Sequence, residues 1–459
     1  MRMANVKQLL RPFSIKSELF ASTFSYAATS TIRLGSSLVL TRLLNPESYG
    51  IFGILTSLLF IIELLSDVGT TALLIRHPRG GEKRFVHTVW TIRLIRSLAN
   101  FALVLIAAPL IARLYGAPVL TGPFRVLSLW FLISGTESMS FVLAQRDRKA
   151  RISNYTDLVT SAIMTVSVIG VAMALHNQYA LIFGALLQRA LLSVASHFFY
   201  RDVGVGLAFD REAIKEQFRF ARFVIPSSGL TILLSQYDKL ILLKFFSFSV
   251  VGIYTVAGSM LAPIIGLITH NARVVLYARC AEYFRTNRET ARSRYYGENH
   301  RLLLVGVLAP AILAGLAPAA VSILYDARYT MAGGVLTITA LGAILLAFQQ
   351  ASENLLVAAG QTHMVLVANI IRMITVVPAS ILGFYLFGLY GFLWFSFGAT
   401  TPLLIYFYYH QHKLKLFRLG PELYLLGAAT LAFVICFALA HVLLGVIPQT
   451  WLHLGIHRH

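Results

Sequence analysis

The sequence predicts an all-α polytopic membrane protein with about thirteen transmembrane helices. Of its 459 residues, 57% are hydrophobic and 13% charged, and the mean hydropathy is +0.72, which is more apolar than a soluble domain can bury. Two distant stretches of the chain also resemble one another. This duplication predicts two lobes of about six helices each around a central cavity, followed by one extra C-terminal helix.

The predicted membrane helices are apolar segments long enough to cross a bilayer, which requires about 20 residues. They cover residues 19–43, 50–75, 87–115, 123–144, 155–175, 179–200, 218–245, 250–273, 302–325, 331–358, 364–387, 389–409 and 423–446. Residues 210–218 and 282–298 mix both charge signs with aromatics at helical spacing, which predicts two cytoplasmic interfacial helices. An ordinary solvated surface helix is an equal alternative for the first.

The duplication is clearest in two turns that each join two apolar segments. Residues 41–52 and 243–254 share a basic residue, a short polar turn, and Gly, Ile and an aromatic at the same spacing. At the same offset, Tyr26, Thr29, Arg33 and Ser36 correspond to Ser228, Thr231, Ser235 and Asp238. Polar stripes in equivalent helices predict a site between the lobes at the bilayer midplane.

The domain prediction follows from the duplication. Residues 1–200 form the N-terminal lobe, 201–217 a cytoplasmic linker or interfacial helix, and 218–410 the C-terminal lobe. Residues 411–459 form the extra transmembrane helix and an external tail.

The net charge of +20 is explained by membrane topology. Basic residues concentrate in alternate short segments, at 1–18, 76–84, 146–151, 201–222, 279–301 and 413–418, which predicts a cytoplasmic N-terminus and an external C-terminus. This distribution argues against a nucleic-acid partner. The first 18 residues lack the pattern of a cleaved signal peptide, so the first helix itself is expected to direct insertion.

Arginines near the middle of membrane helices are the candidate substrate ligands. A charge at the bilayer centre costs about 2.5 to 3.5 kcal/mol, so each needs a partner or a function. Guanidinium suits phosphate because its planar fork donates two parallel hydrogen bonds. Helix 19–43 also carries polar residues at steps of three or four, on one face. The predicted substrate-binding residues are Arg33, Arg189, Arg372, Tyr26, Thr29, Ser37 and Ser235; the alternative is that Arg33 only pairs with a carboxylate and holds the bundle together.

Other intramembrane charges are given other roles. Asp238 and Glu353 are candidates for coupling transport to H⁺ or Na⁺, and no other cofactor is predicted. Glu63 and Asp67, four residues apart, are expected to form structural ion pairs with Arg93 and Arg96 on the next helix.

The sequence does not predict an enzyme. It contains no GxxxxGK[ST], HExxH or GxSxG motif, and its predicted external loops are too short for a catalytic domain. The two cysteines, Cys280 and Cys436, are far apart, so neither a disulfide framework nor a metal site is predicted.

Several strings carry a resemblance to a known family. They lie at residues 42–50, 67–69, 72–76, 142–146, 155–158, 220–223 and 235–240, in one order along most of the chain. The sequence resembles the polysaccharide transporter branch of the multidrug/oligosaccharidyl-lipid/polysaccharide exporter superfamily, which includes O-antigen and exopolysaccharide flippases. The resemblance implies two six-helix lobes around a cavity, often cationic, and a bacterial cytoplasmic membrane location.

The resemblance implies a flippase that moves a polyprenyl-diphosphate-linked oligosaccharide, an O-antigen or exopolysaccharide repeat unit, from the cytoplasmic to the outer leaflet by alternating access. Its expected partners are the lipid-linked glycan, membrane lipids and other polysaccharide-assembly proteins. A drug exporter of the same superfamily is the closest alternative and would require an acidic cavity. A membrane glycan polymerase and a non-transporting assembly scaffold are further alternatives.

Overall fold

The computed structural model describes residues 15–147, 149, 151–200, 203, 205–286, 291–361 and 363–444, and their side chains except at 15–24, 220, 222–233, 274 and 443–444. Within these ranges the regular structure is helical, with no strands, as the sequence predicts. The chain divides into two compact units, Met1–Gly252 and Ile253–His459. The predicted division into residues 1–200, 201–217, 218–410 and 411–459 stays a prediction.

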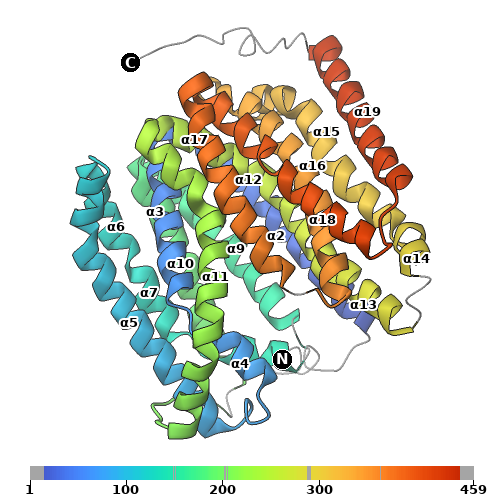
Figure 1. The fold of residues 1–459 in the computed structure, drawn as a ribbon. Coiled ribbons are helices and arrows are strands. Elements are labelled where there is room, and N and C mark those ends of the chain that lie inside the picture. The colour runs from blue at the N-terminus through green and yellow to red at the C-terminus, as the bar shows by residue number, and fades with distance from the viewer. Residues whose placement is uncertain are drawn as a thin grey trace. The chain divides into compact units, whose positions relative to one another are not determined.

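The first unit is a bundle in which α9 packs against α2 and α10, and α3 packs against α11 (Figure 1). Its elements are α2 (Ile15–Leu43), α3 (Pro46–Leu65), α4 (Thr70–Arg76), α5 (Lys83–Leu114), η1 (Pro118–Leu120), α6 (Thr121–Leu127), α7 (Leu129–Thr136), α8 (Ser140–Arg146), α9 (Arg151–Leu175), α10 (Gln178–Ser196) and α11 (Arg211–Phe245). The start of α12 (Phe248–His270) completes it.

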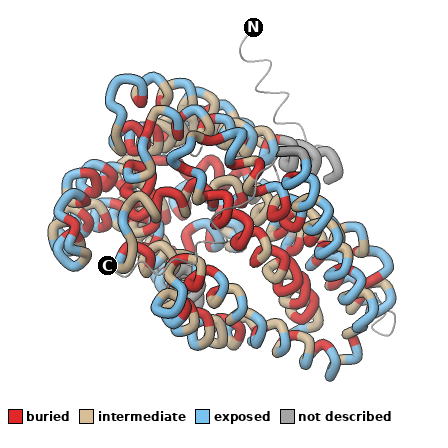
Figure 2. The backbone as a smooth tube through the Cα atoms, turned by 90° about the horizontal axis from the view of Figure 1, so that it is seen from above, coloured by how far each residue is buried: buried red, intermediate tan, exposed pale blue. Residues whose placement is uncertain are grey.

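The second unit is built around a buried helix, α16, against which α15, α17 and α18 pack. Its elements after α12 are the π-helical η2 (Asn271–Leu276), α13 (Tyr277–Thr286), α14 (Ala291–Glu298), α15 (His300–Leu324), η3 (Ala327–Tyr329), α16 (Met331–Ala358), α17 (Met364–Gly398), α18 (Thr401–Lys413) and α19 (Leu419–Leu444). The predicted extra C-terminal helix, α19, lies along α15 (Figure 1). Figure 2 shows buried and exposed residues alternating along most helices, so most helices have one packed face.

Each predicted membrane segment overlaps helix in the structure. Among the described residues, ten helical stretches are long and apolar enough to span a bilayer, so the total of thirteen stays a prediction. Three segments predicted as single helices are broken: 50–75 between α3 and α4, 123–144 at Glu137 between α7 and α8, and 389–409 between α17 and α18. Conversely, the helix predicted at 210–218 and the span 218–245 form one continuous helix, α11. Local periodicity does not reveal such breaks because polar tertiary contacts stabilise them.

The first of the repeated turns starts α3 with a strong helix cap. The Asn45 side chain accepts hydrogen bonds from the Ser48 backbone N–H at 3.0 Å and from the Ser48 hydroxyl at 2.7 Å. Pro46 occupies the first helical turn, where its missing N–H leaves no bond unmade. The polar turn found in the sequence is therefore a helix start.

The glycines of the two repeated turns meet inside the first unit. A Cβ atom built on Gly50 would collide with the backbone carbonyl of Phe248, and one built on Gly252 would collide with that of Pro46. Pro46 and Phe248 are the first residues of α3 and α12. The two copies therefore contact one another reciprocally, and glycine allows the close approach of the two backbones.

We expect Gly50→Ala to lower the free energy of unfolding by about 1 to 3 kcal/mol, because the new methyl group meets a backbone carbonyl that cannot rotate away. Thermal unfolding of the purified protein measures this. Gly35→Ala in α2 is the control, since a Cβ there has no neighbour within 4 Å. Equal stability of the two variants would contradict the tight contact.

A charged network ties the start of α11 to the loop before α5. Asp210 caps α11 by accepting from the Glu212 and Ala213 backbone N–H groups at 2.9 and 3.3 Å. Its other carboxylate oxygen lies 3.0 Å from Nη2 of Arg79. The Ala213 N–H, aided by Arg79, holds the pKa of Asp210 below its usual value of 3.8. The ionised carboxylate therefore stabilises the folded state.

The Asp210 contribution should be fully present above the ordinary aspartate pKa and should disappear as the pH falls through its lowered value. Asp210→Asn keeps a capping side chain but loses the charge that faces Arg79. We expect this variant to melt at a lower temperature than wild type at pH 7 and to match it once Asp210 is protonated. A gap that stays constant down to pH 3 would contradict this assignment.

Candidate functional site

A charged cavity of about 410 Å³ lies inside the first unit. It is walled by residues of α3, α4, α5, α8 and α10 and by the break before α8. Its volume falls within the range of small-molecule sites, about 300 to 1,000 Å³. The charged residues that line it are Glu63, Asp67, Arg93, Arg96, Glu137 and Arg189. Three guanidinium groups thus share one enclosure with three carboxylates.

Glu137 is at the centre of the ion pairs in this cavity. One of its carboxylate oxygens, Oε2, lies 2.8 Å from Nη2 of Arg93 on α5 and 2.8 Å from Nη2 of Arg189 on α10. The residue is 9% exposed. Its backbone leaves the helical region, with φ −59° and ψ 130°, and its carbonyl accepts from Nε1 of Trp90 at 3.1 Å. The helix break therefore directs a carboxylate between two arginines.

The remaining charges of the cavity also have partners. Nη1 of Arg96 donates to Asp67 at 3.1 Å, and Glu63 accepts from the indole N–H of Trp130 at 3.3 Å. The Arg189 guanidinium lies over the Trp130 ring, 5.3 Å from its centroid, which adds a cation–π attraction. The Nε groups of Arg96 and Arg189 are buried and have no hydrogen-bond partner within the described part of the chain.

Glu63, Asp67, Arg93 and Arg96, the four residues predicted to form ion pairs, all line this cavity. Only one ion pair between a carboxylate and an arginine of this set is present in the described residues. Asp67 pairs with Arg96, whereas Arg93 pairs with Glu137 and Glu63 contacts Trp130. Glu137 lies inside the segment predicted at 123–144, but the sequence does not indicate its role, because the break at this residue has no local signature. Trp130 lies in the same predicted segment, and its contacts with Glu63 and Arg189 come only from packing.

Arg33 lies outside this cavity, at another place in the first unit. Its guanidinium is 3.6 Å from Asp157 on α9, and its side chain is 54% exposed. Asp157 also accepts from Gln188 on α10 at 3.3 Å. This geometry agrees with the alternative in which Arg33 joins neighbouring helices, and its exposure leaves it accessible to a ligand.

The polar stripe of α2 does not share one environment. Tyr26 and Arg33 are exposed, Ser37 is half-buried and Thr29 is buried. In the corresponding stripe of α11, Ser235 is exposed and Asp238 half-buried. The side chains of Ser228 and Thr231 lie outside the described residues. The polar residues of each stripe therefore lie on one helical face but differ in how far they are exposed.

Arg372 and Glu353 belong to the second unit. Nη2 of Arg372 on α17 donates to Oε1 of Gln349 on α16 at 3.2 Å. Glu353 is one helical turn beyond Gln349 and is half-buried. Of the three arginines predicted to bind substrate, Arg189 lines the charged cavity of the first unit, Arg33 lies near Asp157, and Arg372 contacts Gln349 within the second unit. In that cavity, carboxylates match guanidiniums in number.

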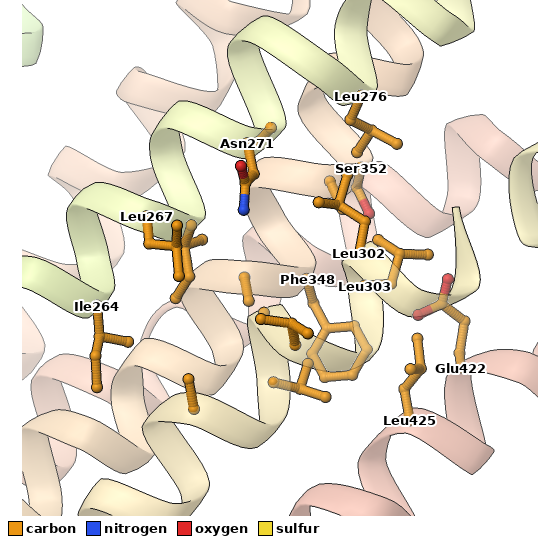
Figure 3. Close-up of a pocket in the computed structure, with 18 of the residues that line it drawn as sticks. Ile264, Leu267, Asn271, Leu276, Leu302, Leu303, Phe348, Ser352, Glu422 and Leu425 are labelled. Carbon is orange, nitrogen blue, oxygen red and sulfur yellow. The ribbon is translucent and has the colours of Figure 1, made fainter. Parts of the chain in front are cut away.

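The second unit contains a different cavity, of about 40 Å³. Figure 3 shows mainly apolar side chains around it, with Asn271, Ser352 and Glu422 as polar members. Glu422 already accepts hydrogen bonds from the hydroxyls of Tyr296 and Tyr408 at 2.9 and 3.0 Å. A cavity of this size holds a water molecule or a small group, not a sugar or a diphosphate. Across the described residues, no group of three His, Cys, Asp or Glu side chains could hold a metal ion.

Comparison with solved structures defines the class of fold. The structure resembles "Lipid II flippase MurJ, inward closed conformation" with a TM-score of 0.73 and 13% identity, over 95% of this chain and 96% of that one. It resembles an inward-facing multidrug resistance MATE family transporter of the MOP superfamily with a TM-score of 0.62 and 17% identity, over 86% and 94%. A point mutant of the Vibrio cholerae MATE transporter VcmN gives a TM-score of 0.52 and 14% identity, over 89% and 96%. The fold is therefore that of the MurJ and MATE membrane transporters.

The family model described as "Polysaccharide biosynthesis protein" matches residues 39–298. This match spans more than half of the chain, and it includes both repeated turns and every charged residue that lines the cavity. The chain belongs to this polysaccharide biosynthesis protein family. No curated protein sequence matches it significantly.

Arg189→Met should lower the free energy of unfolding by about 1.5 to 3 kcal/mol, the usual contribution of a hydrogen bond to a charged group. The substitution removes one of the two guanidiniums at Glu137 and the contact with Trp130. Arg33→Met is the matched control and should change stability less than Arg189→Met, because the single carboxylate contact of Arg33 is longer, at 3.6 Å, and its side chain is more exposed. Thermal unfolding compares the two variants, and a reversed order would contradict the assignment of Arg189 to a cohesive ion cluster.

Proposed function

We propose that the protein is a flippase that moves a polyprenyl-diphosphate-linked oligosaccharide, such as an O-antigen or exopolysaccharide repeat unit, from the cytoplasmic to the outer leaflet of a bacterial cytoplasmic membrane. The single observation that carries the proposal is the charged cavity inside a transporter fold of the polysaccharide biosynthesis family. MurJ, which shares this fold, is described as a lipid II flippase. The lipid part of the substrate would stay in the bilayer while its polar head occupies a protein cavity.

The chemistry of the cavity supports an anionic head group. Arg93, Arg96 and Arg189 bring three always-charged guanidiniums into one enclosure, and guanidinium binds phosphate oxygens through paired donors. Arg33, Arg372, Tyr26, Thr29, Ser37 and Ser235 stay proposed contacts for other parts of the substrate. Asp238 and Glu353 stay proposed sites of H⁺ or Na⁺ coupling, and other polysaccharide-assembly proteins stay proposed partners.

A drug exporter of the same superfamily is the second candidate. It is favoured by Glu63, Asp67 and Glu137, since three carboxylates in the same cavity could attract an organic cation. Binding of a cationic dye that is competed by lipophilic cations but not by pyrophosphate would favour this candidate.

In a strain lacking this protein, lipid-diphosphate-linked oligosaccharide should accumulate on the cytoplasmic leaflet while its synthesis continues. Wild type should restore export, and Arg189→Ala should lower its rate at least about tenfold, because a lost guanidinium–phosphate contact is equivalent to at least about 1.4 kcal/mol. Leaflet-specific labelling of the glycan measures this at matched protein levels.

Arg33→Ala tests the separate contact proposed for Arg33, and intact export by this variant would remove Arg33 from the site. Asp210→Asn, which changes a charge outside the cavity, is the control for nonspecific effects. Normal outer-leaflet delivery in the deletion strain would contradict the flippase function itself.

A further inference from the structure

Glu137 holds the position at which an anionic ligand would meet two arginines. Its Oε2 atom accepts from both Arg93 and Arg189 at 2.8 Å. A phosphate oxygen accepts charge-assisted hydrogen bonds from guanidinium in the same way. A diphosphate that enters this cavity must therefore compete with Glu137 for these donors.

The positive charges of Arg93 and Arg189 explain why a carboxylate such as that of Glu137 is needed between them. Two guanidiniums, 13% and 17% exposed, would repel each other and lose hydration if no anion lay between them. Glu137, Asp67 and Glu63 together balance the charges of the three arginines, so the formal charges of the cavity residues sum to zero. Neutrality lowers the cost of the empty state and also weakens the attraction for an incoming anion.

The arginine set keeps hydrogen-bonding capacity beyond these pairs. A guanidinium offers five donors, yet the Nε groups of Arg96 and Arg189 are buried without a partner within the described residues. The site is therefore balanced in charge without being saturated in hydrogen bonds.

The backbone around Glu137 is a break between two helices rather than a continuous turn. Residue 137 has extended ψ, and Ser138 is held by the Ser196 hydroxyl, which accepts from the Ser138 backbone N–H at 2.9 Å. Glu137 itself is anchored through its carbonyl by Trp90. The break thus fixes the backbone, while the Glu137 side chain lines a cavity of about 410 Å³, into which χ rotations can move the carboxylate away from the arginines.

We propose that Glu137 is a built-in counter-anion, which the diphosphate of the substrate replaces at Arg93 and Arg189 and which returns when the substrate leaves. This role rests on the proposed flippase function for the identity of the diphosphate. The exchange selects anions, because a neutral or cationic ligand cannot take the place of the carboxylate. It also limits affinity, because each bound phosphate displaces an existing pair, and this favours release after translocation.

The test compares binding of inorganic pyrophosphate to purified full-length wild type and to Glu137→Gln, by calorimetric titration in detergent. Glu137→Gln has nearly the same shape but no charge, so we expect pyrophosphate to bind at least about tenfold more tightly, a change equivalent to about 1.4 kcal/mol. Pyrophosphate should also raise the melting temperature of Glu137→Gln more than that of wild type. Equal or weaker binding by the folded variant would overturn the proposal.

Two further variants keep the test decisive. Asp67→Asn makes the same charge change in the same cavity, beside Arg96, and should tighten binding by less than about threefold, since Asp67 is 38% exposed. Glu137→Asp keeps the charge but is too short to bridge both arginines as before, so its affinity should lie between those of wild type and Glu137→Gln. If Glu137→Gln is too unstable to purify, the pyrophosphate affinity of Glu137→Asp tests the proposal instead. An affinity equal to that of wild type would then reject the replacement of Glu137 by the diphosphate.

Farnesyl diphosphate separates this proposal from the proposed function. Tighter binding of farnesyl diphosphate than of pyrophosphate, with the same Glu137→Gln effect, supports a lipid-linked substrate. Equal binding of both probes, with the Glu137→Gln effect intact, would leave the exchange standing and would assign the site to a free diphosphate, against the flippase function. If the protein exports the glycan but Glu137→Gln does not tighten diphosphate binding, the counter-anion role of Glu137 is rejected and the flippase function is not.

Discussion

The bridge from Glu137 to Arg93 and Arg189 is the interaction around which the N-terminal unit is organised. It joins the break before α8 to α5 and α10 through one carboxylate oxygen. Charges inside a membrane protein are expensive unless they are paired. The cavity can therefore contain three guanidiniums only because three carboxylates share it. The helix predicted at 123–144 is interrupted at Glu137, the residue whose carboxylate lies between the two arginines.

The two units differ in how their polar side chains are arranged around cavities. In the first unit, polar groups enclose a space large enough for a ligand. In the second, the carboxylate of Glu422 is satisfied by two tyrosine hydroxyls beside a small, mainly apolar cavity. Satisfied polar groups around little free volume stabilise a bundle, whereas charged groups around a large cavity suit binding. Of these two cavities, only the one in the first unit has the volume of a small-molecule site.

The duplicated turns show a second constraint, the distance between backbones. Gly50 and Gly252 lie where each copy of the turn meets the first residue of the helix in the other copy. A side chain at either position would separate them. The repeat seen in the sequence thus has a physical reason at its glycines, where two helix starts pack without side chains between them. Asn45 and Pro46 define the start of the first of these helices.

The amino-acid sequence by itself determined the all-helical class, the helical segments and the duplication, because in a bilayer each backbone group must be satisfied within its own helix. It also placed the charged residues that line the cavity within predicted membrane segments. Only the tertiary structure decided their pairing, bringing Glu137 rather than Glu63 to Arg93 and placing Arg33 beside Asp157. Partner choice depends on the rotation of each helix and on breaks held by distant groups such as Trp90 and Ser196. Hydropathy reports how apolar a segment is, whereas the direction of each side chain is set by the packing of its neighbours.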